Sequence, residues 1–103
     1  MNREARKVYR QGDVLVRETE IDGSLKRELS SSEKQELVIS GETGHNHSIR
    51  GHYRQSDGLT LLLLDEASQM THPQHATLDL PSGLYEVYRT REFEESGQRF
   101  AFD

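Results

Sequence analysis

Histidine is the residue type whose placement in this sequence most clearly suggests chemistry. All five histidines of the chain fall in one stretch, at His45, His47, His52, His72 and His75. Neutral imidazole is a common ligand of zinc, iron, manganese and nickel. The chain has no cysteine, so a transition-metal site here would use imidazole and carboxylate ligands.

Four of these histidines form two short pairs. His45-Asn46-His47 follows Gly44, and in an extended chain its two imidazoles project from the same face. His72-Pro73-Gln74-His75 forms the second pair, and its proline predicts a turn because the residue before a proline avoids helical geometry. We interpret His45, His47, His72 and His75 as candidate ligands that converge on one divalent metal ion.

A carboxylate near the first pair could complete the site. Three histidines and a water are typical of catalytic zinc, whereas three histidines and a carboxylate suit iron, manganese or nickel. Glu42 is the nearest candidate, either as a fourth ligand or as a general base. A histidine pair alone is a weak signal, since short motifs match by chance. His52, beside Tyr53, is expected on the sheet surface or behind the ligands.

Two arginines near the C-terminus could recognise an anion. Arg89 and Arg91 are predicted to share one strand face with Tyr85, Val87 and Phe93. On an inward face they would bind a carboxylate or phosphate, and Arg91 is therefore a candidate for orienting a small anionic substrate. The alternative is that they pair with glutamates on neighbouring strands, as charged strand residues commonly do.

Short β-rich segments separated by turn residues must position these side chains. The expected strands are residues 14–17, 37–40, 45–49, 51–56, 59–64, 76–80, 84–93 and 98–102. Asp57-Gly58 predicts a hairpin. Leu61 to Leu64 lack alternation, so that strand should be covered on both faces. This pattern predicts an all-β fold, a small antiparallel barrel or sandwich.

The 103 residues are expected to form a single domain. Residues 1–7 are polar and should be flexible, and residues 18–36 should form a mobile loop because they hold turn signals and few apolar residues. Apolar residues make up only 32% of the chain, so the core should be thin. A second copy could complete it against Phe100-Ala101-Phe102, which makes a homodimer an option.

The net charge and the apolar content indicate which classes of partner to expect. Thirteen basic against eighteen acidic residues give a net charge of −5, which argues against nucleic-acid binding because such binding rests on neutralising phosphates. The longest apolar run, Leu61 to Leu64, is far too short for a membrane span. The first residues lack the apolar stretch of a signal peptide, so the cytoplasm is the expected location.

Several motifs occur in an order that resembles a family of small uncharacterised bacterial and phage proteins. That family carries the ordered pattern RQGD, GHxH, HxxH, LPxGxY and QREY. The corresponding segments here are Arg10-Gln11-Gly12-Asp13, Gly44-His45-Asn46-His47, His72-Pro73-Gln74-His75, Leu80-Pro81-Ser82-Gly83-Leu84-Tyr85 and Thr90-Arg91-Glu92-Phe93. The last departs from the pattern, with Phe93 in place of the tyrosine. The resemblance strengthens the histidine grouping and implies no reaction.

A more distant similarity to cupins, or to a β-roll, concerns the fold alone. The resulting expectation is a small metal-binding protein, and one form of it is a metal-dependent enzyme that acts on a small anionic substrate. One alternative is a non-enzymatic binding or regulatory module in which the histidine cluster is structural. Another is an adaptor without metal, whose histidines form hydrogen bonds or respond to pH.

Overall fold

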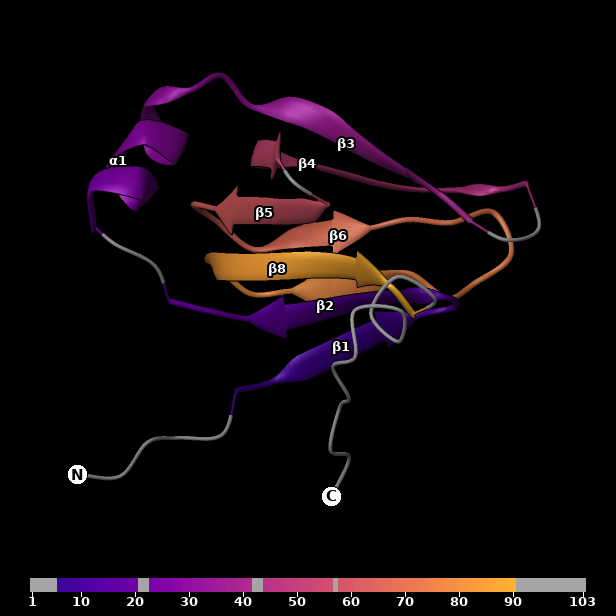
Figure 1. Cartoon of the computed structure of the whole chain (residues 1–103). Helices are drawn as coiled ribbons and strands as arrows, with labels where there is room; N and C mark the ends of the chain where they lie inside the picture. The colour runs from indigo at the N-terminus through magenta and orange to yellow at the C-terminus, as the bar shows by residue number, and fades with distance from the viewer. Residues whose placement is uncertain (1–5, 21–22, 42–43, 57, 91–103) are drawn as a thin grey trace.

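The fold is a curled antiparallel sheet with one helix and one added hairpin (Figure 1). The computed structural model describes residues 6–20, 23–41, 44–56 and 58–90. Its elements are, in chain order, β1 (Val8–Gln11), β2 (Val14–Glu18), α1 (Gly23–Ser31), β3 (Gln35–Ser40), β4 (Asn46–Ser56), β5 (Leu59–Leu64), β6 (Ser68–Met70), β7 (Leu78–Leu80) and β8 (Gly83–Arg89). Six strands form one sheet in the order β1-β2-β8-β5-β4-β3, and β6 pairs with β7.

The mostly-β prediction is confirmed, but a closed barrel, one of the two expected forms, is not found among the described residues. The strand order ends in β1 on one side and β3 on the other. β4 curls the sheet, because its first half pairs with β3 and its second half with β5. Gly51 lies at this change of partner, where a side chain would meet Leu62 and Leu64 at 3.0 and 2.8 Å. The sheet is therefore bent without closing.

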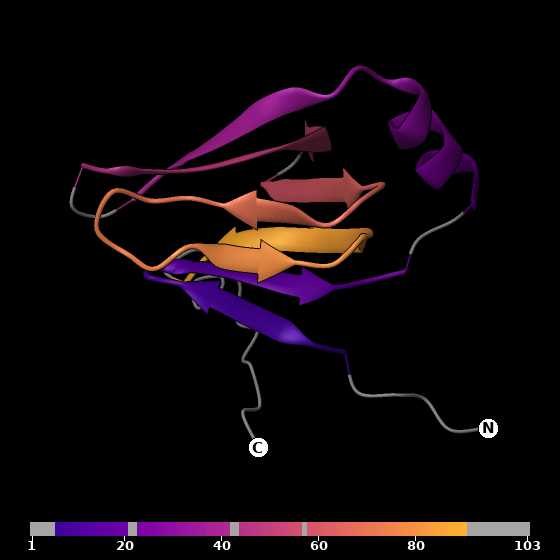
Figure 2. The same cartoon turned by 180° about the vertical axis from the view of Figure 1, so that it is seen from behind.

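The leucine run of β5 is buried from both sides, as its lack of alternation predicts. Leu62 and Leu64 lie in the main core, which also contains Val16, Met70 and Tyr85. Leu61 and Leu63 face the other way and pack with Leu29 of α1 and with Leu84. Seen from behind, the β6–β7 hairpin lies in front of β5 and β8 (Figure 2), and Met70 and Leu80 bring its apolar side chains to the main core.

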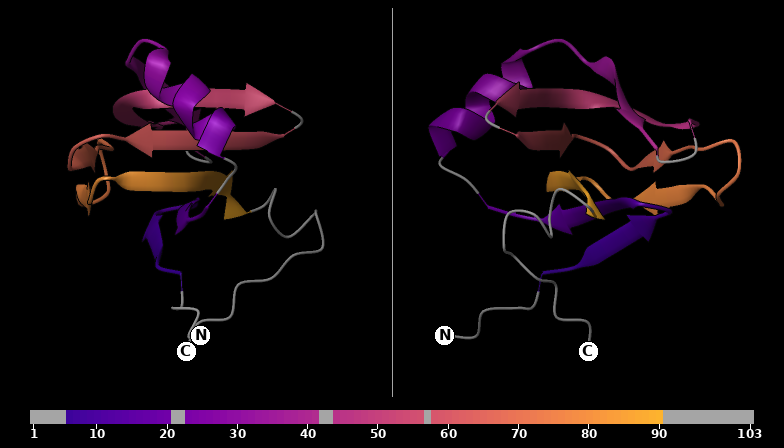
Figure 3. Two further views of the ribbon diagram at one scale, coloured as in Figure 1. Left: turned by 90° about the vertical axis from the view of Figure 1, so that its left-hand side faces the viewer. Right: turned by 45° about the vertical axis from the view of Figure 1, so that its right-hand side comes forward.

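The segment 18–36, for which the sequence suggests a mobile loop, contains regular structure in its described part. β2 extends to Glu18, and α1 occupies Gly23–Ser31 and crosses β4 and β5 (Figure 3). Leu25 and Leu29 are four residues apart, so they lie on the same helix face, and both pack into the cluster over β5. Two leucines in a polar segment are a weak sequence signal for a helix. They are enough to hold the helix on the sheet here, because β5 presents an apolar face to them.

Two tight turns bring functional segments into place. The β1–β2 turn contains Gly12, whose φ of 57° suits glycine, and it places Asp13 just before β2. The predicted β4–β5 hairpin is confirmed, with Ser56 opposite Leu59.

β8 spans Gly83–Arg89 and so overlaps the first part of the predicted strand 84–93. Residues 91–103 lie outside the described part. Residues 1–5 also lie outside it, while the Lys7 amide donates to Glu18 Oε1 at 2.8 Å. The single described helix is too short and too polar to span a membrane.

Candidate metal centre

The two histidine pairs meet in space, as the sequence predicts. The imidazole centres of His47 and His72 are 4.4 Å apart, and those of His72 and His75 are 4.5 Å apart. His47 and His75 stack at 6.2 Å, and His45 lies 6.1 Å from His72. We call these four residues the histidine cluster. They come from the start of β4 and from the loop between β6 and β7, which lie beside each other in Figure 1.

A pair of backbone hydrogen bonds fixes this meeting. The amide of Ser48 donates to the Thr71 carbonyl at 3.0 Å, and the amide of Thr71 donates to the Ser48 carbonyl at 2.9 Å. Ser48 follows His47, and Thr71 precedes His72. The bridge therefore holds the two histidines in adjacent positions before any ligand is considered.

The β1–β2 turn supplies a third wall, which the sequence-based prediction did not assign to the site. His47 Nδ1 lies 2.9 Å from Gln11 Oε1, and His47 Nε2 lies 3.0 Å from Asp13 Oδ1. These partners stand more than thirty residues before His47 in the sequence. Asp13 is thus the carboxylate that the described structure brings to the cluster.

Gln11 determines which nitrogen of His47 carries a proton. Its Nε2 donates to the carbonyls of Met70 and Ala76, both at 2.9 Å. These two bonds use both amide hydrogens and point Oε1, which can only accept, at His47 Nδ1. Nδ1 must therefore carry a hydrogen, and the lone pair of neutral His47 lies on Nε2, toward Asp13.

The contact between His47 Nε2 and Asp13 needs a positive group to be favourable. Two atoms that both bear lone pairs would repel each other at 3.0 Å, so a proton must lie between them, or a cation must bind to both. His47 is fully buried, and the Asp13 side chain is 16% exposed. A buried contact of this kind is a position where a metal ion can replace a proton.

His72 differs from His47 in its hydrogen-bond partners, which lie in its own turn. Its Nδ1 accepts the backbone N–H groups of Gln74 and His75, at 3.0 and 3.3 Å. Burial, and then the neighbouring His47, His75 and His45, hold the pKa of His72 below its usual value, although Asp13 opposes this. Neutral His72 thus closes the turn that presents His75, with its hydrogen on Nε2.

Two glycines allow the rings to approach the backbone closely. A side chain at Gly12 would run into the imidazole of His75. At Gly41 it would lie 3.3 Å from His47 Nε2 and 3.5 Å from Asp13 Oδ1. The Gly41 amide also donates to the His45 carbonyl at 2.9 Å. Gly41 therefore packs closely against the side chains of His47 and Asp13.

The described residues contain no set of three or more His, Asp or Glu side chains that could hold a metal ion as they lie. One reason is that two ring nitrogens already have hydrogen-bond partners. His47 Nε2 contacts Asp13 Oδ1, and His72 Nδ1 accepts backbone N–H groups. The donor types nevertheless fit a transition metal, since imidazoles and one carboxylate are gathered at one place. Metal binding would require some of the outer rings to turn.

The other predicted site residues lie elsewhere. Glu42 and Arg91 are outside the described residues. His52 is not in the cluster: its Nδ1 donates to the Ser32 carbonyl at 2.8 Å, and the residue is 7% exposed beside the end of α1. It is a buried structural residue, not the surface residue that was one expectation for it.

The sequence held a signal for Gln11 and Asp13. Arg10-Gln11-Gly12-Asp13 places three polar side chains around a glycine between two apolar strands, and polar residues next to a tight turn often serve a site. The direction in which they point depends on strand pairing, so their partner could not be read from spacing.

One protein-family model, described as Domain of unknown function (DUF8820), matches residues 10–90 of the chain. This range includes Gln11, Asp13 and all four members of the histidine cluster. No curated protein and no solved structure matches the chain at a significant level.

Proposed function

Because the chain belongs to the DUF8820 family, which is described only as a domain of unknown function, we propose a function from the geometry of the site. The histidine cluster binds one divalent transition-metal ion, and His47 and Asp13 are its anchored ligands. We also infer that this family is the one with the ordered bacterial and phage motifs, since four of the five motifs lie within residues 10–90.

The observation that carries the proposal is the orientation of His47. Gln11 holds the Nδ1 hydrogen, so Nε2 is left to bind a cation together with Asp13 Oδ1, 3.0 Å away. Metal-binding histidines usually donate their second ring N–H to an oxygen in this way, which fixes the tautomer and the ring orientation. His47 therefore has the environment of a ligand, even without the other rings.

The remaining imidazoles are close enough to complete the coordination. Two imidazoles on one metal ion have ring centres about 5 Å apart, because each metal–nitrogen bond is about 2 Å long. Neighbouring ring centres in the cluster are 4.4 to 6.2 Å apart. His75 and His45 are the first candidates. His72 would join only by releasing its backbone hydrogen bonds or its Nε2 proton.

The outer side of the site is exposed to solvent, which favours a catalytic role over a purely structural one. His47 is buried, His45 and His72 are half-buried, and His75 is exposed. A metal ion bound there would polarise a water or a substrate oxygen at neutral pH. Zinc, iron, manganese and nickel all suit a set of imidazoles with one carboxylate. On this reading the protein is a metal-dependent enzyme whose substrate is a small anion.

A second candidate is a non-enzymatic module in which the cluster is structural. The observation in its favour is that Gln11 ties three segments together through Met70, Ala76 and His47. Such a network stabilises the fold with or without a metal. In this case a metal ion, if bound, would have four protein ligands and no open position.

Metal titration of the full chain tests the proposal. Protein without a histidine tag, freed of metal by a chelator, is titrated with Zn²⁺ and Co²⁺ by calorimetry, and bound metal is counted by elemental analysis. We expect one ion per chain. His47→Gln keeps a buried amide but lacks the basic nitrogen, and should weaken binding by about 100-fold or more, since a metal ligand is lost.

His52→Asn is the matched control, because it removes a buried histidine outside the cluster and keeps a donor for the Ser32 carbonyl. We expect this variant to bind metal like the unchanged chain. Equal metal affinity of His47→Gln and the unchanged chain would refute the assignment. An absorption spectrum of the Co²⁺ form separates the two candidates, since a site closed by four protein ligands would not respond to added anions.

A further inference from the structure

β3 is an edge strand with one free side. It ends the strand order of the sheet, and none of the described residues pairs with it on the side opposite β4. Figure 1 shows β3 along the upper margin of the fold. Edge strands are usually short, or carry charges, proline or a bulge, which prevents pairing with another chain. β3 has six residues with a continuous register, no proline and one charged residue, Glu36, so it is weakly protected.

The register with β4 shows which backbone groups face the free side. In an antiparallel pair, every second residue exchanges its backbone hydrogen bonds with the residue opposite. The Gly41 amide donates to the His45 carbonyl at 2.9 Å, so the odd-numbered residues of β3 bond to β4. The N–H and C=O groups of the even-numbered residues therefore point away from β4. These residues are Glu36, Val38 and Ser40.

The residue opposite Val38 supports this assignment. Ser48 of β4 lies opposite Val38, yet its amide and carbonyl both bond to Thr71. Among the described contacts, no hydrogen bond reaches the outward backbone groups of β3. These groups are therefore available to another strand.

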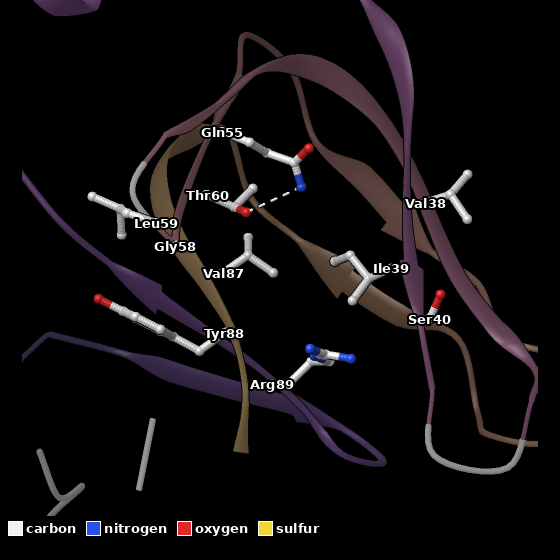
Figure 4. Close-up of a pocket in the computed structure, with 10 residues that line it drawn as sticks. All are labelled: Val38, Ile39, Ser40, Gln55, Gly58, Leu59, Thr60, Val87, Tyr88 and Arg89. Carbon is white, nitrogen blue, oxygen red and sulfur yellow. Dashed lines mark hydrogen bonds between the residues drawn. The ribbon is translucent and has the colours of Figure 1, made fainter. Parts of the chain in front are cut away.

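The side chains of β3 alternate between two faces. Leu37 is buried in the main core, and Ile39 packs against that core. In Figure 4, Ile39 extends toward Val87, whereas Val38 points the opposite way. Val38 is 46% exposed, and of the described residues it is the one large apolar residue that is exposed. A second strand beside β3 would cover part of this valine, since β-branched side chains pack well across strands.

We propose that β3 pairs with β3 of a second copy of this chain, in antiparallel orientation, across a twofold axis at Val38. This register places Val38 opposite itself and Glu36 opposite the partner's Ser40. All three residues with outward backbone groups then bond to one another. Moving the axis by one residue would place either Glu36 or Ser40 opposite a residue outside β3, so this register makes the most hydrogen bonds.

The side chains of the edge are also complementary to a second copy. Glu36 lies opposite a serine, so no like charges meet, and its carboxylate can accept the hydrogen of that hydroxyl. On the core face, Leu37 lies beside the partner's Ile39, and on the other face the two Val38 side chains meet. The edge is therefore complementary to itself, as a twofold interface requires.

Sedimentation velocity of the full, untagged chain measures this pairing. A chelator is present, so that the histidines cannot join two copies through a metal ion. We expect monomer and dimer in an equilibrium that depends on concentration. The dissociation constant should be on the order of 10 μM, because an interface built mainly on one strand is at the small end for protein contacts.

Val38→Pro removes the donor at the axis and should weaken the dimer about tenfold or more. Proline suits this position, because edge strands tolerate it where the N–H faces solvent. Val8→Pro is the matched control on β1, the opposite edge of the sheet. The Glu18 amide donates to the Lys7 carbonyl, which places the Val8 N–H on the free side of β1. This control should dimerise like the unchanged chain.

Cysteine substitutions test the register, since the chain has no cysteine of its own. The Cα atoms of a hydrogen-bonded pair are about 5.5 Å apart, which suits a disulfide. With oxidised glutathione, which is reduced as the two thiols join, Val38→Cys should form a covalent dimer. Ser40→Cys alone should not, because the two Ser40 positions are about 13 Å apart along the paired strands. A mixture of Ser40→Cys and Glu36→Cys should form the mixed covalent dimer.

A chain that stays monomeric at every concentration would leave the edge to an extended segment of another protein, and would overturn the proposal. So would a dimer that is equally strong in folded Val38→Pro, or a Ser40→Cys variant that cross-links as fast as Val38→Cys, since either result would place the contact elsewhere. If Val38→Pro does not fold, the cysteine variants decide. None of these results bears on metal binding, which is measured separately with His47→Gln.

Discussion

At the scale of single residues, Gln11 orients the imidazole of His47 through a hydrogen bond to Nδ1. It is 3% exposed, and its amide uses both hydrogens and its oxygen on partners from three segments. Of the described contacts, this set fixes the direction of His47 Nε2. An exposed glutamine, by contrast, would have little influence on either stability or metal binding.

Replacing Gln11 by Met should weaken metal binding about 10- to 100-fold, the usual effect of losing an outer hydrogen bond to a ligand. The free energy of unfolding should fall by about 1–3 kcal/mol, because the buried Met70 carbonyl and the partly buried Ala76 carbonyl lose their donor. Calorimetric metal titration and urea denaturation measure the two effects.

Gln69→Met is the control for that variant. Gln69 is exposed, and its Nε2 donates to Asp79 Oδ1 at 2.8 Å, the one side-chain hydrogen bond it makes among the described contacts. It should change neither metal affinity nor stability by a measurable amount. Full metal affinity in Gln11→Met would mean that His47 is not a ligand through Nε2.

The sequence predicts the histidine residues of the cluster better than it predicts their partners. His45, His47, His72 and His75 could be grouped because they are short pairs of one residue type. Gln11 and Asp13 could not be joined to them, because β1 and β2 reach His47 only through the curvature of the sheet. Aspartate is also a common turn residue, so its type alone indicates no site.

At the scale of elements, α1 and the β7–β8 turn secure the sheet from two sides. α1 covers Leu61 and Leu63, and its end is tied by His52 Nδ1 to the Ser32 carbonyl. The β7–β8 turn is held by Tyr85, whose hydroxyl donates to the Pro81 carbonyl at 2.7 Å. Neither contact involves the histidine cluster, so each can be altered without removing a candidate ligand.

Leu29→Ala should lower the free energy of unfolding by about 2–4 kcal/mol, because Leu29 is 3% exposed and its removal leaves a cavity over β5. Urea denaturation measures this effect. Metal affinity of the folded variant should not change. A loss below about 1 kcal/mol would show that α1 is not packed on β5, and that the expected mobile loop is the better description.

Stability should decline at high pH because of Tyr85. Burial raises the pKa of Tyr85 from 10.0 to about 12. The unfolded chain therefore releases this proton at a lower pH than the folded chain, and stability is lost as the pH rises from about 10 toward 12. Tyr85→Phe should reduce this decline, as judged from urea denaturation across that range.

The control for Tyr85 is Tyr53→Phe, a partly buried tyrosine of β4 that packs against the same core. It should leave the decline in place. An identical slope in Tyr85→Phe and the unchanged chain would contradict the link between this hydroxyl and stability.

Strands were predictable where apolar residues are concentrated, and the helix was not. Leu61 to Leu64 indicated a strand covered on both faces because no residue in the run is polar. α1 was missed because its segment contains Leu25 and Leu29 among charged and serine residues. Tertiary packing on β5 stabilises this helix, and local sequence patterns do not report such packing.

At the scale of the whole molecule, the histidine cluster joins parts of the chain that are far apart in sequence. The β1–β2 turn, the start of β4 and the loop between β6 and β7 all meet there. No closed barrel forms among the described residues, because β1 and β3 stand at opposite ends of the strand order and do not pair with each other. Residues 91–103, with the expected strand 98–102 and the dimer contact expected from the sequence, lie outside the described part.

A metal ion that ties these three segments together should stabilise the folded chain. At a concentration one hundred times its dissociation constant, a ligand adds about 2.7 kcal/mol, which corresponds to a rise in melting temperature of roughly 10 °C or more for a domain of this size. Differential scanning calorimetry with Zn²⁺ should show this rise in the unchanged chain and in His52→Asn. Mg²⁺, which prefers oxygen ligands, should have little effect, and an equal rise in His47→Gln would place the metal elsewhere.

The most direct test is a nitrogen-15 NMR spectrum of the histidine rings, recorded before and after one equivalent of Zn²⁺ is added to the full, untagged chain. Before addition, His47 Nδ1 should carry a hydrogen. After addition, His47 Nε2 and at least two other rings of the histidine cluster should shift as metal-bound nitrogens, while His52 stays unchanged. Rings that do not respond to Zn²⁺, or a response at His52 instead of His47, would contradict a metal centre built on His47 and Asp13.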